Sequence, residues 1–218
     1  MKDKFLDIYK QWVTRPGADE FLKWLEGTDF FNAPASTRFH LARPGGLVEH
    51  SVHVYERLLR LYRAEHTDPD APGEYFLTPE EMETVAIIGL LHDICKVGVY
   101  RQEPKNQKTY DPEKVAAAQK WQVKHDALGD FIWETVMGYS FDDQLPYGHG
   151  EKSVYIISAF MKLSREEAMA IRWHMGFSDT EFKAGGNGVG NAFDKFPLAV
   201  LAHIADLQAS YLDEPRQE

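Results

Sequence analysis

A histidine and an aspartate stand side by side in this sequence, directly after an apolar run, and residues of these types can together bind a metal ion. The apolar segment 88–91 predicts that His92 and Asp93 are buried. An unpaired carboxylate in apolar surroundings costs on the order of several kcal/mol, so Asp93 needs a cationic partner. The neutral nitrogen of His92 and the anionic oxygen of Asp93 suit a divalent transition metal. The pair therefore predicts a metal site.

The same dipeptide occurs again as His125 and Asp126, but its surroundings are different. Polar residues precede it, including Gln122 and Lys124, and Asp130 follows shortly after. We interpret this second copy as part of a solvated helix face with no chemical role.

Other candidate residues lie near apolar segments elsewhere in the chain. Each is on or beside a separate predicted helix whose apolar face would turn toward a common core. Together with the first pair, the candidates are His50, His92, Asp93, His149, His174 and Asp206. His40 precedes a glycine pair and is a further candidate for lining a pocket, because loop residues often carry function.

The elements that must position these residues are predicted to be helices. A capping box begins at Thr78, and the helix that follows it carries His92 and Asp93 near its end. No segment shows convincing strand alternation, so the predicted fold class is all-α, a helical bundle with the metal site in its core. We expect helices near residues 5–12, 21–25, 47–64, 79–93, 112–123, 154–161, 165–174 and 197–212.

Length and composition indicate a single domain. The chain has 218 residues, enough for one sizeable core, and we expect residues 1–38 to form a helical extension of a core at 39–212. It contains neither a run of 18 apolar residues nor a leader pattern, so membrane spanning and secretion are not expected. The single cysteine, Cys95, fits the reducing cytoplasm, where we expect the protein to reside.

Charge constrains the partners of the chain. It has 24 basic and 34 acidic residues and a formal charge of −10, which disfavours binding to long nucleic acids. The segment 96–110 is locally basic, and we interpret it as a solvated loop in which Arg101 is a candidate contact for a substrate phosphate. The glycine-rich segment 183–191 follows no predicted strand, so we expect a mobile loop or lid there rather than a dinucleotide-binding loop.

The order of these motifs resembles the binuclear subset of the HD superfamily of metal-dependent phosphohydrolases, with its H...HD...H...H...D pattern. The segment 45–50 is similar to the family's first-histidine helix, 91–96 to its His-Asp signature followed by lysine, and 201–206 to its last-aspartate helix. Cys95 stands where glycine is common in the family. The resemblance extends over most of the chain, from about residue 39 to residue 212.

The resemblance implies two divalent transition-metal ions that share Asp93. The second ion would be bound by Asp93, His149 and His174. The first would be bound by His50, His92, Asp93 and Asp206. Four histidines among six ligands favour iron, manganese, nickel, cobalt or zinc over magnesium.

Lys96 lies three residues after Asp93. On a continuing helical turn its side chain would reach the opening of the predicted metal site. There it would neutralise a phosphoryl oxygen or help to protonate the leaving group. Alternatively, it only complements the dipole at a helix end.

The function that the resemblance implies is hydrolysis of a small phosphate ester, by a phosphohydrolase or phosphodiesterase that uses a metal-activated hydroxide. The motif spacing is most similar to a branch of 3′-to-5′ exoribonucleases, but the acidic charge favours nucleotide-sized substrates. Two alternatives are a di-iron oxygenase similar to myo-inositol oxygenase and a non-catalytic nucleotide-binding sensor. Iron content with oxygen consumption would identify the oxygenase. The pattern predicts no particular oligomeric state.

Overall fold

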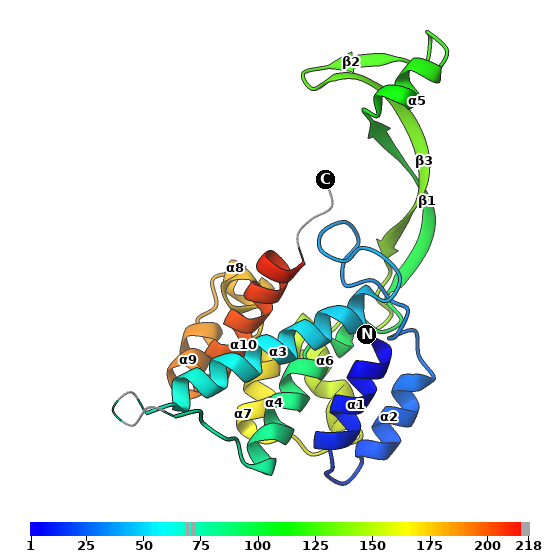
Figure 1. Ribbon diagram of the computed structural model, residues 1–218. Coiled ribbons are helices and arrows are strands. Elements are labelled where there is room, and N and C mark those ends of the chain that lie inside the picture. The colour runs from blue at the N-terminus through cyan, green and yellow to red at the C-terminus, as the bar shows by residue number, and fades with distance from the viewer. Residues whose placement is uncertain (69, 71–72, 215–218) are drawn as a thin grey trace.

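Helices form the body of the molecule, as the sequence predicts (Figure 1). A computed structural model describes residues 1–68, 70 and 73–214. The helices of the body are α1 (Lys2–Trp12), α2 (Ala18–Glu26), α3 (Gly46–His66), α4 (Pro79–Leu91), α6 (His149–Ser158), α7 (Arg165–Arg172), α8 (Thr180–Lys183), α9 (Gly188–Lys195) and α10 (Pro197–Gln208). None of the described helices combines the length and apolar character that a membrane span requires.

Helix α4 is central because its C-terminal half is apolar on every side. All its residues from Val85 to Leu91 are buried. The predicted capping box fixes its start, since the Thr78 hydroxyl accepts a hydrogen bond from the Glu81 amide at 3.2 Å and the Glu81 carboxylate accepts one from the Thr78 amide at 2.8 Å. The regular helix ends at Leu91, so the next two residues, His92 and Asp93, lie at a buried helix end.

The first 38 residues contribute to the same core as the rest of the body. Phe5 of α1 and Leu25 of α2 are fully buried in one cluster with Leu58 of α3 and Ile87 of α4. Helix α1 packs against both α3 and α4. The N-terminal extension is therefore packed into the helical body as part of its core.

The prediction that no strands occur is wrong for residues 100–141, which we call the arm. The arm contains an antiparallel sheet of three strands in the order β1-β3-β2, namely β1 (Tyr100–Thr109), β2 (Lys124–Asp126) and β3 (Gly129–Phe141). The short helix α5 (Pro112–Ala117) lies between β1 and β2 in the chain. Tyr100 lies opposite Phe141 and Thr109 opposite Ile132. The arm projects beyond the helical body (Figure 1). Most of β1 is solvent-exposed, so its sequence lacks the alternation that a half-buried strand shows.

The basic segment 96–110 is therefore mostly strand rather than loop, and the second His-Asp pair lies in β2 rather than on a helix. The glycine-rich segment 183–191 also differs from its prediction, because α9 begins at Gly188. Burial outweighs the poor helix propensity of glycine here, since Val189 of α9 packs with Trp173 in a small second cluster. Helix α10 is shorter than predicted and continues into a π-helix, Ala209–Asp213.

Candidate metal centre

Two close helix contacts bring the candidate histidines together. At the first, Gly89 of α4 lies against α3, where an added Cβ would be 2.5 Å from the Tyr55 Cα. Only glycine permits this approach without displacing backbone. The contact places the Nε2 atoms of His50 on α3 and His92 at the end of α4 only 3.2 Å apart.

The second close contact joins α6 and α7. A Cβ at Gly150 would clash with the Arg172 carbonyl oxygen, so this position also needs glycine. His149 begins α6, five residues earlier than the predicted start of that helix, and His174 follows α7. Their ring centroids lie 5.1 Å apart.

Asp93 lies between the two histidine pairs and presents one oxygen to each. Its Oδ1 is 2.8 Å from His149 Nε2 and 3.6 Å from His174 Nε2. Its Oδ2 is 3.6 Å from both His50 Nε2 and His92 Nε2. Three groups of side chains among the described residues are suited to a metal ion, and two of them contain Asp93: one with His50 and His92, the other with His149 and His174. The third group is His40, His50 and Glu214.

Asp206 completes the set of six predicted residues. It lies on α10, and its Oδ1 is 3.2 Å from His50 Nε2. Asp206 belongs to none of the three groups, although it adjoins the group of His50, His92 and Asp93 through His50. The structure thus brings together all six side chains that sequence reasoning selected.

The imidazoles of His92 and His174 are held with Nε2 toward the centre. His92 Nδ1 lies 3.0 Å from the Gly89 carbonyl oxygen, and His174 Nδ1 lies 2.7 Å from the Ile171 carbonyl oxygen. A backbone acceptor at Nδ1 fixes the tautomer in which Nε2 has a free lone pair, as metal-binding histidines require. The buried Nε2 of His174 has no hydrogen-bond partner in the part of the chain that the structure describes.

This donor set fits a divalent transition metal. Neutral imidazole nitrogens and carboxylate oxygens converge on a buried centre, and the unsatisfied His174 Nε2 would gain a partner on binding an ion. The residues present can therefore hold the metal that the sequence predicts. The identity and the number of ions belong to the proposal below.

Glu214 is a functional candidate that sequence reasoning missed. Its carboxylate is fully buried and lies 3.0 Å from His50 Nδ1 and 2.7 Å from His53 Nδ1. Burial alone would raise its pKa, but hydrogen bonds to these histidines outweigh burial and lower the pKa of Glu214 to about 2. Glu214 is therefore an anion that orients His50, while His53 supports Glu214 rather than the centre itself.

The charges of the side chains at this centre compensate one another. Burial alone would lower the pKa of His50, but hydrogen bonds to Asp206 and Glu214 raise it to about 10. Burial dominates at His92 and lowers its pKa to about 3. A ligating imidazole must be neutral, so a metal that binds here displaces a proton from His50.

Lys96 is anchored beside Asp93, as its position in the sequence suggests. Its Nζ lies 2.6 Å from Asp93 Oδ2 and 2.8 Å from the Ala35 carbonyl oxygen. Burial opposes charge on both side chains, yet their mutual attraction lowers the pKa of Asp93 and raises the pKa of Lys96. Both groups are therefore charged at neutral pH.

A cavity of about 500 Å³ opens onto this centre. His40 lines it, as predicted, together with Lys96. Burial lowers the pKa of His40 to about 4, so its imidazole is neutral. Arg101 does not belong to the cavity wall: it lies on the arm and pairs with Asp142. The structure therefore brings His40, but not Arg101, to the site.

The fold and the site together define a helical protein with a buried histidine and aspartate cluster of a kind that holds divalent metals. The sequence profile of the family described as HD domain matches residues 47–211, most of the chain. The chain belongs to this family, whose members are in general metal-dependent hydrolases, and the predicted resemblance to the HD superfamily is confirmed. No curated protein and no solved structure matches the chain.

Proposed function

We propose that this protein is a metal-dependent phosphohydrolase or phosphodiesterase that acts on a small, nucleotide-like or other phosphate ester. The observation that carries the proposal is the position of Asp93, whose two carboxylate oxygens face different histidine pairs. A bridging carboxylate between two nitrogen-rich sites suits a pair of divalent ions. Membership of the HD-domain family supports the same reaction class.

Each side chain has a role in this proposal. Asp93, His149 and His174 would hold one ion. His50, His92, Asp93 and Asp206 would hold the other. Such a pair, when bound, would supply an activated water and neutralise the charge that develops on the phosphoryl oxygens. Iron, manganese, nickel, cobalt and zinc all match the ligand types.

Lys96 is the cation that the chain itself provides. An ammonium group has three N–H donors, and two of them are directed at Asp93 and the Ala35 carbonyl. Because Lys96 also lines the cavity, we infer that the remaining donor binds a phosphoryl oxygen of the substrate. A positioned cation of this kind stabilises charge that grows in the transition state.

The cavity walls support a substrate with a planar ring. Phe39, Tyr100, Phe141 and Tyr211 contribute aromatic surface to the same cavity as the candidate ligands. Its volume of about 500 Å³ is in the usual range for a small-molecule site. His40 has an Nε2 atom without a hydrogen-bond partner among the described residues, and we assign it to a polar group of the substrate.

The test is hydrolysis of a panel of phosphate esters by protein loaded separately with each of the five metals. The panel contains p-nitrophenyl phosphate, bis(p-nitrophenyl) phosphate, nucleoside monophosphates, cyclic nucleotides and short oligonucleotides. We expect turnover of at least one ester, which a chelator and the Asp93→Ala variant abolish.

Other outcomes would overturn the proposal. Oxygen consumption by the iron-loaded protein without ester hydrolysis would identify the di-iron oxygenase. Saturable nucleotide binding without turnover under any metal would identify the sensor.

A further inference from the structure

A sulfur contact sets His149 apart from the other three candidate histidine ligands. A metal ion bound at Nε2 of an imidazole leaves the ring proton on Nδ1, where it needs a hydrogen-bond acceptor. Oxygen atoms lie at this nitrogen in three of the rings, those of His50, His92 and His174. Among the described residues, the partner of His149 Nδ1 is instead the thiol of Cys95, with Sγ at 3.4 Å. Sulfur is a weak acceptor, so His149 has the weakest support of the four.

His149 also depends on this support more than the other rings do, because it is the least buried of them. Its side chain is 33% exposed, whereas the side chains of the other three histidines are each 1% exposed. Close packing on all sides restrains a buried ring. The orientation of His149 therefore depends mainly on its two polar partners, Asp93 at Nε2 and Cys95 at Nδ1.

The fold fixes the thiol beside this histidine. Cys95 lies on a 3-10 helix, Ile94–Lys96, which directly follows Asp93 and packs against α6. The Cys95 amide donates a hydrogen bond to Ser153 Oγ of α6 at 3.1 Å, and the residue is 4% exposed. This contact joins the turn after Asp93 to the helix that begins with His149.

The geometry makes the sulfur a support of the second ion's position rather than one of its ligands. Cys95 Sγ lies 3.4 Å from His149 Nδ1 and 3.7 Å from Nε2, so it is nearer to the nitrogen that does not face Asp93. The sulfur also lies 4.0 Å from Asp93 Oδ1. A thiol is both a weak donor and a weak acceptor, so it can accept from His149 and donate toward Asp93.

His174 gives independent evidence that this position receives a ligand. Its side chain is 1% exposed, and its Nε2 lies 3.6 Å from Asp93 Oδ1. That nitrogen has no hydrogen-bond partner among the described residues. A buried polar atom normally has a partner, and an ion between Asp93, His149 and His174 would provide one. Cys95 adjoins the same position through His149.

We propose that Cys95 is the positioning residue for the second ion: its sulfur orients His149 as the Glu214 carboxylate orients His50 for the first ion. The inference rests on the two-ion centre of the proposed function. Loss of an orienting partner of this kind typically lowers metal affinity by about 10–100-fold. Removal of the thiol should therefore weaken the second ion alone, and removal of the Glu214 charge should weaken the first.

Calorimetric titration of the metal-free full chain with manganese tests the proposal, because it measures the affinity for each ion without a substrate. The wild-type protein should bind two ions per chain. Cys95→Ala should weaken one of them by about 10–100-fold. In electron paramagnetic resonance, the exchange-coupled signal of the ion pair should then appear only at correspondingly higher manganese concentrations.

The His174→Ala background identifies which ion is affected. That substitution removes a ligand of the second ion, so a single ion, the first, should remain. Addition of Cys95→Ala should leave the affinity for this ion unchanged, whereas addition of Glu214→Gln should lower it by about 10-fold or more. A lower affinity for the first ion on addition of Cys95→Ala would overturn the proposal.

Cys95→Ser separates a role in orientation from a role in packing. Serine and alanine both lack the volume of the sulfur, but the serine hydroxyl is a hydrogen-bond acceptor. The second ion should therefore bind more tightly to Cys95→Ser than to Cys95→Ala. Equal affinities of the two variants would overturn the proposal, since packing alone would then explain the loss.

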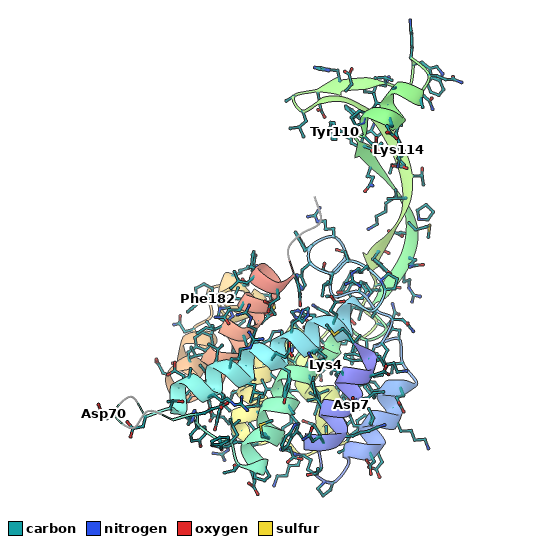
Figure 2. The ribbon with its side chains drawn as sticks, in the orientation of Figure 1. Lys4, Asp7, Asp70, Tyr110, Lys114 and Phe182 are labelled. Atoms are coloured by element: carbon teal, nitrogen blue, oxygen red, sulfur yellow. The ribbon has the colours of Figure 1, made fainter. Side chains whose placement is uncertain are left out.

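His125→Ala is the control for adventitious binding, because His125 is an exposed histidine outside the centre. It lies on the arm beside Asp126, which accepts a hydrogen bond from the Tyr110 hydroxyl at 2.9 Å. Figure 2 shows Tyr110 near the far end of the arm, away from the helical body. Both ions should bind to this variant as they bind to the wild type.

The remaining outcomes separate this inference from the proposed function. Two ions that bind to Cys95→Ala as tightly as to the wild type would overturn the inference and leave the two-ion centre intact. A wild-type chain that binds one ion or none would overturn the centre itself, and the inference with it. An intense near-ultraviolet charge-transfer band in the cobalt-loaded wild type would identify the sulfur as a ligand of the ion and would overturn its positioning role.

Discussion

The two His-Asp dipeptides of this chain lie in regions of opposite character. His92 and Asp93 are 1% and 2% exposed at the end of a central helix. The imidazole of His125 is 76% exposed on the arm. The residue types are identical, so the difference between the two sites comes from what surrounds them.

Burial explains why one dipeptide gathers partners and the other does not. Water solvates His125, so a single exposed contact to Asp130 is sufficient there. Asp93 has no such solvation, and several side chains compensate its charge instead, among them His149 and Lys96. A buried carboxylate surrounded by nitrogen atoms is what a metal ion can bind.

The largest predicted effect comes from removing the buried dipeptide. The double variant His92→Ala and Asp93→Ala removes the ligand that both proposed ions share, so ester hydrolysis should be abolished. Steady-state kinetics on the best substrate of the panel measures this loss.

The equivalent variant on the arm, His125→Ala and Asp126→Ala, is the control for the buried dipeptide. Among the described residues, the side chains that it removes bind only within the arm, so its turnover should equal that of the wild type. Equal loss of activity in the two double variants would contradict the view that only the buried dipeptide belongs to the centre.

The second prediction concerns the number of ions. His174→Ala removes a nitrogen that faces only Oδ1 of Asp93, so it should empty one position and leave the other filled. Electron paramagnetic resonance of the manganese-loaded protein should change from an exchange-coupled pair, as expected for ions about 3.5–4 Å apart, to a single isolated ion. An isolated-ion signal already in the wild type would point to a mononuclear centre.

A smaller effect is expected at Lys96. Lys96→Ala should lower the turnover number by about 10²-fold, the usual loss for a donor to transition-state charge, while the metal content stays the same. Arg101→Ala is the control on the arm, since Arg101 binds Asp142 and lies outside the cavity wall. If Lys96→Ala hydrolyses every ester at the wild-type rate, Lys96 only complements the dipole at a helix end.

Substitutions at two glycines test how tightly the helical body and the arm are packed. Gly89→Ala places a methyl group 2.5 Å from the Tyr55 Cα, where backbone must move, and should lower the free energy of unfolding by about 1–3 kcal/mol. Gly138→Ala on β3 meets the side chain of Lys105, whose Cδ would lie 2.9 Å and whose Cγ would lie 3.3 Å away. Because this side chain is exposed and can move, the variant should change the free energy of unfolding by less than about 0.5 kcal/mol. Urea unfolding measures both, and equal losses would contradict the comparison.

The smallest effect is a dependence of stability on pH. Burial would raise the pKa of Glu167, but hydrogen bonds from Arg15 and the Ser164 amide outweigh it and hold the pKa below the usual 4.5. Glu167 therefore stabilises the fold above about pH 4.5, and this contribution is lost as the pH falls below that value.

Glu167→Gln should accordingly cost about 1.5 kcal/mol at pH 7, the worth of a charged hydrogen bond, and the difference from wild type should shrink as the pH falls. On the arm, Asp126→Asn should have no measurable effect on global unfolding, because exposed ion pairs contribute little. Urea unfolding between about pH 3 and pH 7 measures both variants. A Glu167→Gln difference that grows on acidification would contradict the assigned pKa.

Much of the helical body could be predicted because its sequence signals are local. The capping box at Thr78 and the buried run in α4 each depend on residues close in the chain. The six candidate ligands were also identifiable, since each is a metal-binding residue type beside an apolar segment. Their convergence depends on Gly89 and Gly150, whose role at helix contacts is visible only in the fold.

The arm and Glu214 could not be predicted for physical reasons. Strand β1 is solvent-exposed along most of its length, so no apolar alternation marks it, and cross-strand pairing with β3 forms it instead. Glu214 lies 164 residues after His50 and follows exposed residues of the π-helix. Only the fold turns its carboxylate inward.

The metal content of the purified wild-type protein, measured per chain after loading and removal of free ions, tests the central claim most directly. A buried centre in which Asp93 serves two histidine pairs predicts two equivalents of a divalent transition metal. One equivalent would contradict the shared position of Asp93. A chain that retains no metal would contradict the centre itself.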